Sequence, residues 1–385
     1  MSGSSKVAES NRNRPLVTAH NQSRVRSYVR CRRQYFYRYD YPVLYLGADQ
    51  GQELTPIYPS LPLKRGSWMH KLQEAYFLQL GGLPTPVVIQ RGKRRTEHSA
   101  DGWEEVHELM SSEFMRLFEE QREQYGDLPT ECDRMFRGYL KRWKGDNDRF
   151  RLAKQHDGSP AVEMMVTWPL EKYGIKAPFK GRIDLLVEDL EYGGLWIRDA
   201  KWMKVIPGPD ERTMSPQNIM YTWAGRKMGY DIRGFIYDYG RTKAPSIPYV
   251  LKRGTVSTAK KIDTDVATYF KTIKEVHKGE WKLYLPVYRE KLLELKEREK
   301  TWFDRERITV EGPRYRQGFK EYILAAQDIE NRGKPFRTYI RACKWDCDYH
   351  EPCVAQFQGL DIERLMTTQY HIEEERYGID EEDNG

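Results

Sequence analysis

The segment from Gly181 to Tyr221 constrains the fold of this 385-residue chain more than any other, because it places several polar side chains of complementary chemistry near one another. Branched residues from Gly181 to Glu188 and alternating residues from Leu195 to Trp202 predict two strands joined by a glycine-containing turn. Side chains on a strand point to one face at every second residue. Asp199 and Lys201 are therefore predicted to lie side by side near the end of the second strand.

The same segment supplies three more polar side chains. Asp184, in the first strand, can lie opposite Asp199. Ser215 and Pro216 have the chemistry of a helix start, and the glycine that follows predicts a helix of about 13 residues. Gln217 and Tyr221 are four residues apart and must share one face of it. One small site is thus predicted to have all these side chains in reach.

Two close aspartates and one neutral ligand form an oxygen-rich pocket that suits Mg²⁺ or Mn²⁺. The metal removes the repulsion between the acids, and an adjoining lysine can position a water and offset charge on a phosphorane-like transition state. This combination predicts a phosphodiester hydrolase. The alternative is a surface hairpin with an ordinary ion pair, which D-x-K alone favours. The full pattern, with a fifteen-residue gap between the acids and a Q-x-x-x-Y helix after them, is far rarer.

The rest of the chain predicts a mixed α/β (α+β) fold with a central mixed β-sheet flanked by helices. Residues 161–170 and 233–240 predict the first and fourth strands of that sheet. Helices are expected from Ser23 and from Ser67, and over about 102–125, 130–143, 257–278, 286–303 and 315–331. Residues 90–98 read as a basic loop.

One large domain is expected between two polar ends. The expected divisions are a disordered arm at 1–22, a single domain at 23–360 with a helical insertion at 81–160, a catalytic sheet and helix at 161–240, a mainly helical part at 241–340, and an acidic tail at 361–385. Net charge is +7, but residues 373–385 carry −6, so the remainder carries +13. A basic body suits a polyanionic partner, although it is equally typical of a solvated surface.

Other features narrow the class of protein. No apolar run reaches membrane-spanning length and no leader precedes the domain, so a cytoplasmic protein with no membrane partner is expected. The sequence contains no GxxxxGK[ST] pattern, so we expect no ATP-driven motor in this chain. Five cysteines without a leader argue against disulfides. Cys132 reads as an ordinary buried or half-buried residue. The remaining four thiols, Cys31, Cys343, Cys347 and Cys353, suit either an iron-sulfur cluster or zinc, with unligated cysteines as the third alternative.

Three motifs resemble the RecB-type branch of the PD-(D/E)XK nuclease superfamily, which has a restriction-endonuclease-like core: Gly181-Arg-Ile-Asp184, Asp199-Ala-Lys201 and Gln217-x-x-x-Tyr221. Ile183 stands where the superfamily's name has proline. The resemblance implies a further metal ligand from a histidine in a G-x-x-x-H context on an upstream helix, and Gly66-Ser-Trp-Met-His70 matches that pattern. His70 taken alone reads as a structural histidine.

The cysteines extend the resemblance to AddB-type nucleases and related CRISPR-adaptation nucleases, whose S-x₄-Y-x₂-C-P-x₂-F motif and three later cysteines bind a [4Fe-4S] cluster. Ser23, Tyr28, Cys31 and Tyr35 match the spacing, and the later cysteines supply the rest. Arg32 replaces the proline, and the closing spacing begins C-x₃-C rather than C-x₂-C. Such a cluster, or zinc in its place, would join the two ends of the chain across a loop of about 300 residues, where a link is expected to stabilise most.

The expected function is therefore a metal-dependent DNA nuclease, an exonuclease with preference for single strands or DNA ends, serving recombination, repair or processing beside recombination or replication proteins. The resemblance implies metal binding by His70, Asp184 and Asp199, help to the attacking water from Lys201, and positioning by Gln217 and Tyr221. The alternative is a nucleic-acid-binding adaptor of a recombination or spacer-acquisition complex with little or no turnover. RNA as substrate also stays open.

Overall fold

The computed structural model describes residues 15–91, 94–143, 145–243, 245–259, 261–298 and 302–374. Its centre is a six-stranded sheet in the order β4-β6-β7-β8-β9, with β5 also paired to β6. The β7–β8 pair is parallel and the other pairs are antiparallel, so the sheet is mixed. The strands are β4 (Phe150–Leu152), β5 (Val162–Trp168), β6 (Phe179–Asp189), β7 (Leu195–Met203), β8 (Ile232–Arg241) and β9 (Phe303–Thr309).

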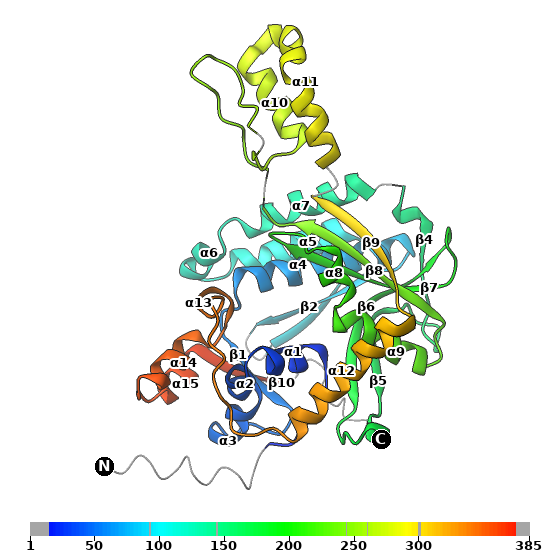
Figure 1. Cartoon of the computed structure of the whole chain (residues 1–385), viewed down its shortest axis with the longest axis vertical. Coiled ribbons are helices and arrows are strands. Elements are labelled where there is room, and N and C mark those ends of the chain that lie inside the picture. The colour runs from blue at the N-terminus through cyan, green and yellow to red at the C-terminus, as the bar shows by residue number, and fades with distance from the viewer. Residues whose placement is uncertain are drawn as a thin grey trace.

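Helices cover both faces of this sheet (Figure 1). One face packs against α1 (Gln22–Arg30), α9 (Pro216–Lys227) and α12 (Gly312–Glu330), around a core that includes Ile197, Ile219 and Phe235. The other face packs against α4 (Leu61–Leu80), α5 (Trp103–Met115) and α7 (Leu128–Trp143). The expected central mixed sheet flanked by helices is confirmed. No helix in the described part of the chain is long and apolar enough to cross a membrane.

Residues 81–160 are not a purely helical insertion. They begin with an antiparallel hairpin of β2 (Thr85–Arg91) and β3 (Arg94–Ala100), where a basic loop was expected. The helix expected over 102–125 is divided into α5 and α6 (Glu119–Tyr125). Cys132, expected to be buried or half-buried, is fully buried and belongs with Phe136 to the same apolar core as α4. This part therefore completes one face of the central sheet.

The two ends of the described chain lie side by side (Figure 1). Strand β1 (Gln52–Pro56) pairs with β10 (Tyr370–Glu374), and Leu54, Tyr349 and Met366 share a small apolar core. The expected tail at 361–385 is thus wrong for residues 361–374, which form α15 and β10; residues 375–385 lie outside the described part. The remaining elements here are α2 (Arg32–Tyr35), η1 (Phe36–Asp40), α3 (Tyr41–Tyr45), α13 (Cys343–Asp346), α14 (His350–Phe357) and α15 (Glu363–Gln369).

The expected disordered arm at 1–22 also needs correction. Residues 1–14 lie outside the described chain, but His20 is buried and forms a β-bridge with Phe179. The first helix is capped by the Asn21 side chain, which accepts from the Arg24 N–H at 2.7 Å, two residues before the expected Ser23 cap. Helix α4 likewise begins before the expected Ser67, with a proline in its first turn, and ends at Leu80 with Gly81 as its C-cap.

A helical hairpin lies between β8 and β9 and projects from the body at the top of Figure 1. It consists of α10 (Val266–His277) and α11 (Trp281–Arg298), which enclose their own apolar core. Helix α10 starts nine residues after the predicted Ser257, because Asp265 accepts from the Thr268 N–H and caps it. The short elements still unnamed are α8 (Pro209–Thr213), η2 (Asn147–Arg149), η3 (Glu171–Tyr173) and η4 (Lys278–Glu280).

Candidate active site

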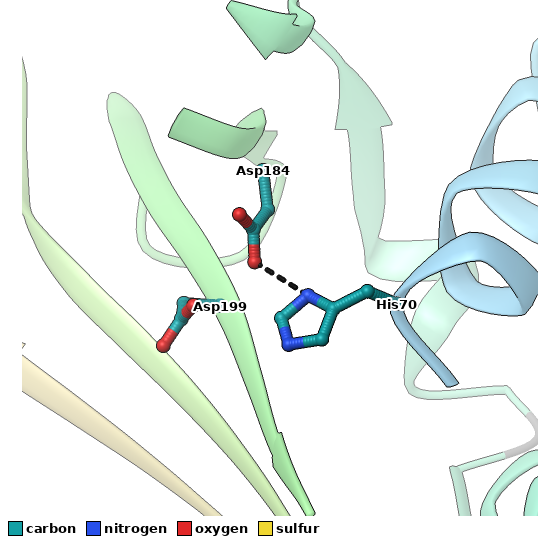
Figure 2. Close-up of side chains that lie close together, drawn as sticks. All are labelled: His70, Asp184 and Asp199. Carbon is teal, nitrogen blue, oxygen red and sulfur yellow. Dashed lines mark ion pairs between the residues drawn. The ribbon is translucent and has the colours of Figure 1, made fainter. Parts of the chain in front are cut away.

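His70, Asp184 and Asp199 converge from three elements, α4, β6 and β7 (Figure 2). In the part of the chain that the structure describes, they are the one group of three or more His, Cys, Asp or Glu side chains whose ligand atoms all lie within 4.8 Å of one another. His70 Nδ1 is 2.9 Å from Asp184 Oδ2. Asp199 is buried, while the other two side chains stay partly exposed.

The two strands place the acids together. The ladder between β6 and β7 ends at the pair Leu185–Arg198, and Asp184 and Asp199 are the next residues along each strand. The strands separate there, so both carboxylates sit at an opening in the sheet rather than inside a closed ladder. His70 reaches this opening from α4.

Lys201 and Gln217 complete the polar surroundings of Asp199. Lys201 Nζ is 3.0 Å from Asp199 Oδ1 and 2.7 Å from Oδ2, and its side chain is 32% exposed. Gln217, in the first turn of α9, directs its Nε2 to Asp199 Oδ1 at 3.5 Å. Lys201 therefore has one end at the acid and can still meet a substrate.

Tyr221 plays a different part from Gln217. It is buried, and its ring packs near Phe179 and directly on the backbone of Gly181. A Cβ added at Gly181 would lie only 2.7 Å from Tyr221 Cε1. The glycine that opens the G-R-I-D motif thus makes room for the tyrosine ring, and this contact sets the position of α9 against β6.

The charges at this site are unbalanced. Burial, and then the nearby charge of Asp184, raise the pKa of Asp199 from its ordinary 3.8 to about 7, against the opposing effect of Lys201. Burial would raise the pKa of Asp184 too, but His70 outweighs it and holds that pKa below its usual range. Burial lowers the pKa of His70, but the charge and hydrogen bond of Asp184 together with the charge of Asp199 raise it above its ordinary value. The site therefore retains protons near neutral pH that a cation can replace.

The donor set fits a divalent cation. Asp184 Oδ2 and Asp199 Oδ2 are buried, and although each has a nitrogen nearby, neither receives a hydrogen bond of good geometry. Two carboxylate oxygens and one imidazole nitrogen suit Mg²⁺ or Mn²⁺. A cation here would also remove the repulsion that raises the pKa of Asp199.

Two glutamates near Asp184 were not predicted from the sequence. Glu74 lies one turn after His70 on α4 and pairs with Lys71 at 2.8 Å. Glu163 on β5 faces Arg182 at 3.3 Å and has a left-handed backbone with φ of 49°. Burial raises the pKa of both glutamates, and the charge of Asp184 adds to that rise. The four-residue spacing from His70 was a signal for Glu74, whereas nothing in the sequence marks Glu163.

The model of the PD-(D/E)XK nuclease superfamily matches residues 19–354 of this chain. The chain belongs to the PD-(D/E)XK nuclease superfamily. No curated protein matches it significantly. Membership implies phosphodiester hydrolysis of a nucleic acid with a divalent metal, and the acidic site at His70, Asp184 and Asp199 agrees with that chemistry.

This PD-(D/E)XK protein also brings four cysteines to one cavity. Cys31 lies between α1 and α2, Cys343 and Cys347 bound α13, and Cys353 is in α14; all four line the cavity, together with Arg30 and Arg337. The backbone N–H of Thr338 donates to Cys31 Sγ at 3.4 Å, and that of Ile340 donates to Cys343 Sγ at 3.4 Å. Burial raises the pKa of Cys347 to about 11, so a cation is needed to hold its thiolate.

The spacing of these thiols differs from that of a zinc site. A tetrahedral zinc with bonds of about 2.3 Å needs sulfurs about 3.8 Å apart. Among the described residues, no three of the four sulfurs lie within 4.8 Å of one another. The thiols share a cavity without forming a closed four-thiolate shell.

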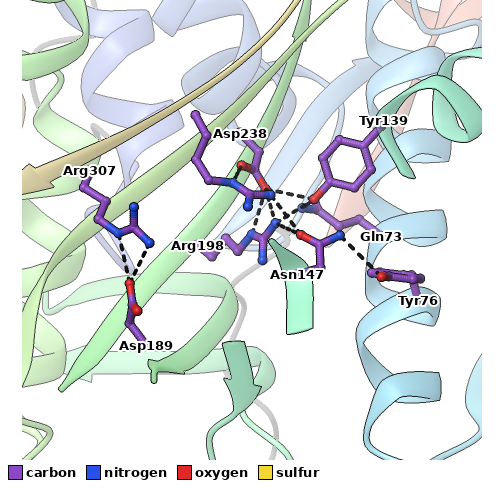
Figure 3. Close-up of polar contacts among 9 residues, drawn as sticks. Gln73, Tyr76, Tyr139, Asn147, Asp189, Arg198, Asp238 and Arg307 are labelled. Carbon is purple, nitrogen blue, oxygen red and sulfur yellow. Dashed lines mark hydrogen bonds and ion pairs between the residues drawn. The ribbon is translucent and has the colours of Figure 1, made fainter. Parts of the chain in front are cut away.

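A second polar cluster of this superfamily member lies on the opposite face of β7 (Figure 3). Arg198 is fully buried and donates to Asp238 Oδ2 at 2.7 Å, to Tyr139 Oη at 2.7 Å and to Asn147 Oδ1 at 2.9 Å. Arg305 from β9 reaches the same Asp238 and Asn147. We call Tyr139, Asn147, Arg198, Asp238 and Arg305 the buried arginine network.

Proposed function

We propose that this protein is a DNA exonuclease that hydrolyses phosphodiester bonds with Mg²⁺ or Mn²⁺ held by His70, Asp184 and Asp199. The observation that carries the proposal is the convergence of these three ligand atoms within 4.8 Å, beside Lys201. The preference for DNA ends and single strands is supported by the resemblance of the Gln217–Tyr221 helix and the cysteine pattern to RecB-type and AddB-type nucleases. The superfamily match supports the hydrolysis itself.

The side chains divide the work. A bound metal ion would polarise the scissile phosphate and stabilise the charge that develops on it. Lys201, fixed by Asp199 and partly exposed, orients the attacking water and offsets the same charge. Gln217 donates to Asp199 Oδ1, which Lys201 also contacts, and Tyr221 packs on Gly181 and so positions the helix that carries Gln217.

We further infer that Cys31, Cys343, Cys347 and Cys353 hold a [4Fe-4S] cluster as a structural link. A four-iron cluster spreads its thiolates farther apart than a single ion does, which agrees with sulfurs that share a cavity yet stay apart. Arg30 and Arg337 in the cavity wall would offset its negative charge. Zinc is the alternative occupant of the four thiols.

In this proposal the enzyme processes DNA during recombination or repair, beside recombination or replication proteins. The alternative is an adaptor of such a complex, or of a spacer-acquisition complex, with little or no turnover. The contact of Lys201 with Asp199 favours an active enzyme, because binding alone gives no reason to keep a lysine at a metal-binding acid.

The test of the nuclease uses end-labelled linear DNA, single-stranded and double-stranded, with circular DNA of the same sequence and Mn²⁺. We expect linear DNA to be degraded and circles to resist. Asp184→Ala and Lys201→Ala should each lower cleavage by about 10²–10³-fold while DNA binding is retained, because each removes charge stabilisation of the transition state. Parent-like cleavage by both variants would show that the active site lies elsewhere, and cleavage of circles would exclude strict end dependence.

The test of the cluster is the metal content of anaerobically purified protein. We expect the protein to contain iron and sulfide and to show a broad absorbance at about 400 nm. Cys31→Ser should lose the iron, whereas Cys132→Ser, which changes a buried thiol outside the cavity, should keep it. One zinc per chain without iron would overturn the cluster in favour of zinc.

A further inference from the structure

The projecting helical hairpin carries more positive charge than its size predicts. Residues 245–298, which comprise the hairpin and the segment that leads into it, contain twelve Lys and Arg and seven Asp and Glu, a balance of +5 in a chain whose total is +7. Its helices pack on their own core, which includes Tyr269, Ile273 and Tyr288, and they project away from the central sheet (Figure 1). None of the candidate active-site residues lies in it. The hairpin therefore offers a basic surface that catalysis does not explain.

A groove runs between α10 and α11 on this surface. Six apolar side chains line it, among them Phe270, Leu285 and Leu292, and the three other lining residues are Lys282, Arg289 and Lys296. No acidic side chain lines it. Leu293, on the same wall, is 56% exposed. We call this feature the basic groove.

The basic residues of the groove follow a regular pattern. Lys282, Arg289 and Lys296 are seven residues apart, so they form one stripe along α11, and Leu285 and Leu292 form a parallel apolar stripe. None of the three cations has an ion-pair partner within the described chain, in contrast to Lys291, which pairs with Glu294 at 2.9 Å. The acids of α11 are not among the residues that line the groove. Charge along the groove is thus unopposed.

We propose that the basic groove binds an acidic amphipathic helix of a partner protein. Such a helix places apolar anchors at i, i+3, i+4 and i+7, which matches an apolar wall with a seven-residue repeat. Carboxylates at the same repeat on its flank would meet Lys282, Arg289 and Lys296. Single-stranded DNA fits less well, because such sites use aromatic stacking platforms and Phe270 is the one aromatic side chain in the wall.

The test uses the full chain and a fluorescein-labelled synthetic helix. The peptide has leucines at i, i+4, i+7 and i+11 and glutamates along one flank at seven-residue spacing, and fluorescence anisotropy measures its binding. We expect saturable binding that Lys282→Glu/Arg289→Glu/Lys296→Glu weakens by more than tenfold. The matched control, Lys252→Glu/Arg253→Glu/Lys261→Glu, makes the same charge change in the segment that leads into the hairpin, outside the groove wall, and should bind like the parent. No saturable binding up to millimolar peptide, or equal weakening by both triple variants, would overturn the proposal.

Two further measurements separate this occupant from others. A labelled oligo-dT strand, bound in EDTA, should bind the groove variant and the parent alike; loss of that binding would make the groove a nucleic-acid site. Light scattering should give the same mass for both proteins, and a parent dimer that the groove variant dissociates would make the occupant a second copy. The groove variant should cleave a short oligonucleotide at the parent rate. Because peptide binding is measured without cleavage, failure of the proposed nuclease activity would leave this test intact.

Discussion

Arg198 and Asp199 are consecutive on β7, and their side chains lie in two different environments. The acid beside Arg198 is held ionised, whereas the surroundings of Asp199 favour its protonated form. Arg198 joins the buried arginine network, where three of its contacts are hydrogen bonds of 2.7–2.9 Å and Asp238 balances its charge (Figure 3). Asp199 lies near Asp184 at the opening of the sheet, with His70 beside Asp184 (Figure 2). Lys201 contacts Asp199 but does not keep its pKa low. In the first cluster the two arginines share Asp238 and only Arg198 Nη1 has no hydrogen-bond partner within the described chain, whereas in the second the facing oxygens of both acids have none.

The two aspartates on neighbouring strands report this difference. Burial alone would raise the pKa of Asp238, but Arg198 and Arg305 overcome it and lower that pKa to about 2. Burial and Asp184 instead raise the pKa of Asp199 to about 7. A buried acid whose pKa is strongly raised beside other ionisable groups is typical of a functional site. The arginine network should therefore serve stability, and the acidic site should reduce it.

The largest expected effect follows from breaking the network with Asp238→Asn. Two guanidinium groups would stay buried without their carboxylate, so we expect a loss of about 3–5 kcal/mol in the free energy of unfolding, measured by urea denaturation at pH 7. A depressed carboxyl pKa contributes stability above the ordinary value of 3.8 that is lost as pH falls toward about 2. The variant and the parent should therefore converge in that range. A loss under 1 kcal/mol would mean that the network is not a stabilising unit.

Asp199→Asn should act in the opposite direction on stability. The folded protein holds the Asp199 proton up to about pH 7, whereas an unfolded aspartate releases it near 3.8. This raised pKa favours folding at low pH, and that contribution is lost as pH rises from about 4 to 7. Without divalent metal, the neutral amide should thus make the variant more stable than the parent at pH 8, with no gain below pH 4.

The same variant should lose DNA cleavage by about 10²–10³-fold, because it removes one ligand and the partner of Lys201. Unfolding curves at pH 4 and 8 and cleavage of labelled DNA measure the two effects. If the variant is less stable than the parent at pH 8, or still cleaves, the acidic face of β7 does not exchange stability for catalysis as expected.

The local pattern around this contrast was predictable from sequence. Alternation on β7 predicts that Asp199 and Lys201 share a face, and the turn before them allows Asp184 to lie opposite. Strand β9 was missed and assigned to a helical region, because its sequence FDRERIT is mostly charged. Arg305 and Arg307 are held in the sheet by Asp238 and Asp189, which are distant in sequence. A rule that reads charged residues as exposed cannot find a strand whose charges are paired inside.

Long-range contacts account for the other errors. Residues 370–374 read as an acidic tail because their neighbours in sequence are acidic, yet they pair with β1, more than 300 residues away. His70 was assigned to the site by resemblance alone, since nothing local distinguishes it from a structural histidine. The position of Glu163 depends on a left-handed backbone inside β5, and the periodicity of the sequence does not reveal such a conformation.

Divalent metal should stabilise the acidic site in a pH-dependent way. The pKa of His70 is raised and that of Asp199 lies near 7, so a metal ion must displace protons that the site holds below neutral pH. Mn²⁺ at 100 times its Kd would add about 2.7 kcal/mol, and the rise in Tm at fixed Mn²⁺ should be larger at pH 8 than at pH 6. Asp184→Ala should remove the shift. An equal shift at both pH values, or one that survives in Asp184→Ala, would place the metal elsewhere.

The smallest expected effect tests whether the surface of α4 beside the candidate active site leaves room for substrate. Gly66 lies inside α4, one turn before His70, and an added Cβ would meet nothing within 4 Å. A helix-interior glycine costs about 0.5–1 kcal/mol relative to alanine, so Gly66→Ala should raise stability by that amount.

Gly138→Ala on α7 is the matched control, because its Cβ would lie 3.0 Å from Phe303 Cζ and the alanine gain should be offset. Packing gives no reason for Gly66. In the proposed nuclease, the space beside it would admit the DNA backbone that approaches the metal ligands. We therefore expect Gly66→Ala to raise the KM for cleavage while it stabilises the fold. Unchanged cleavage in a more stable Gly66→Ala protein would show that the substrate does not pass this turn of α4.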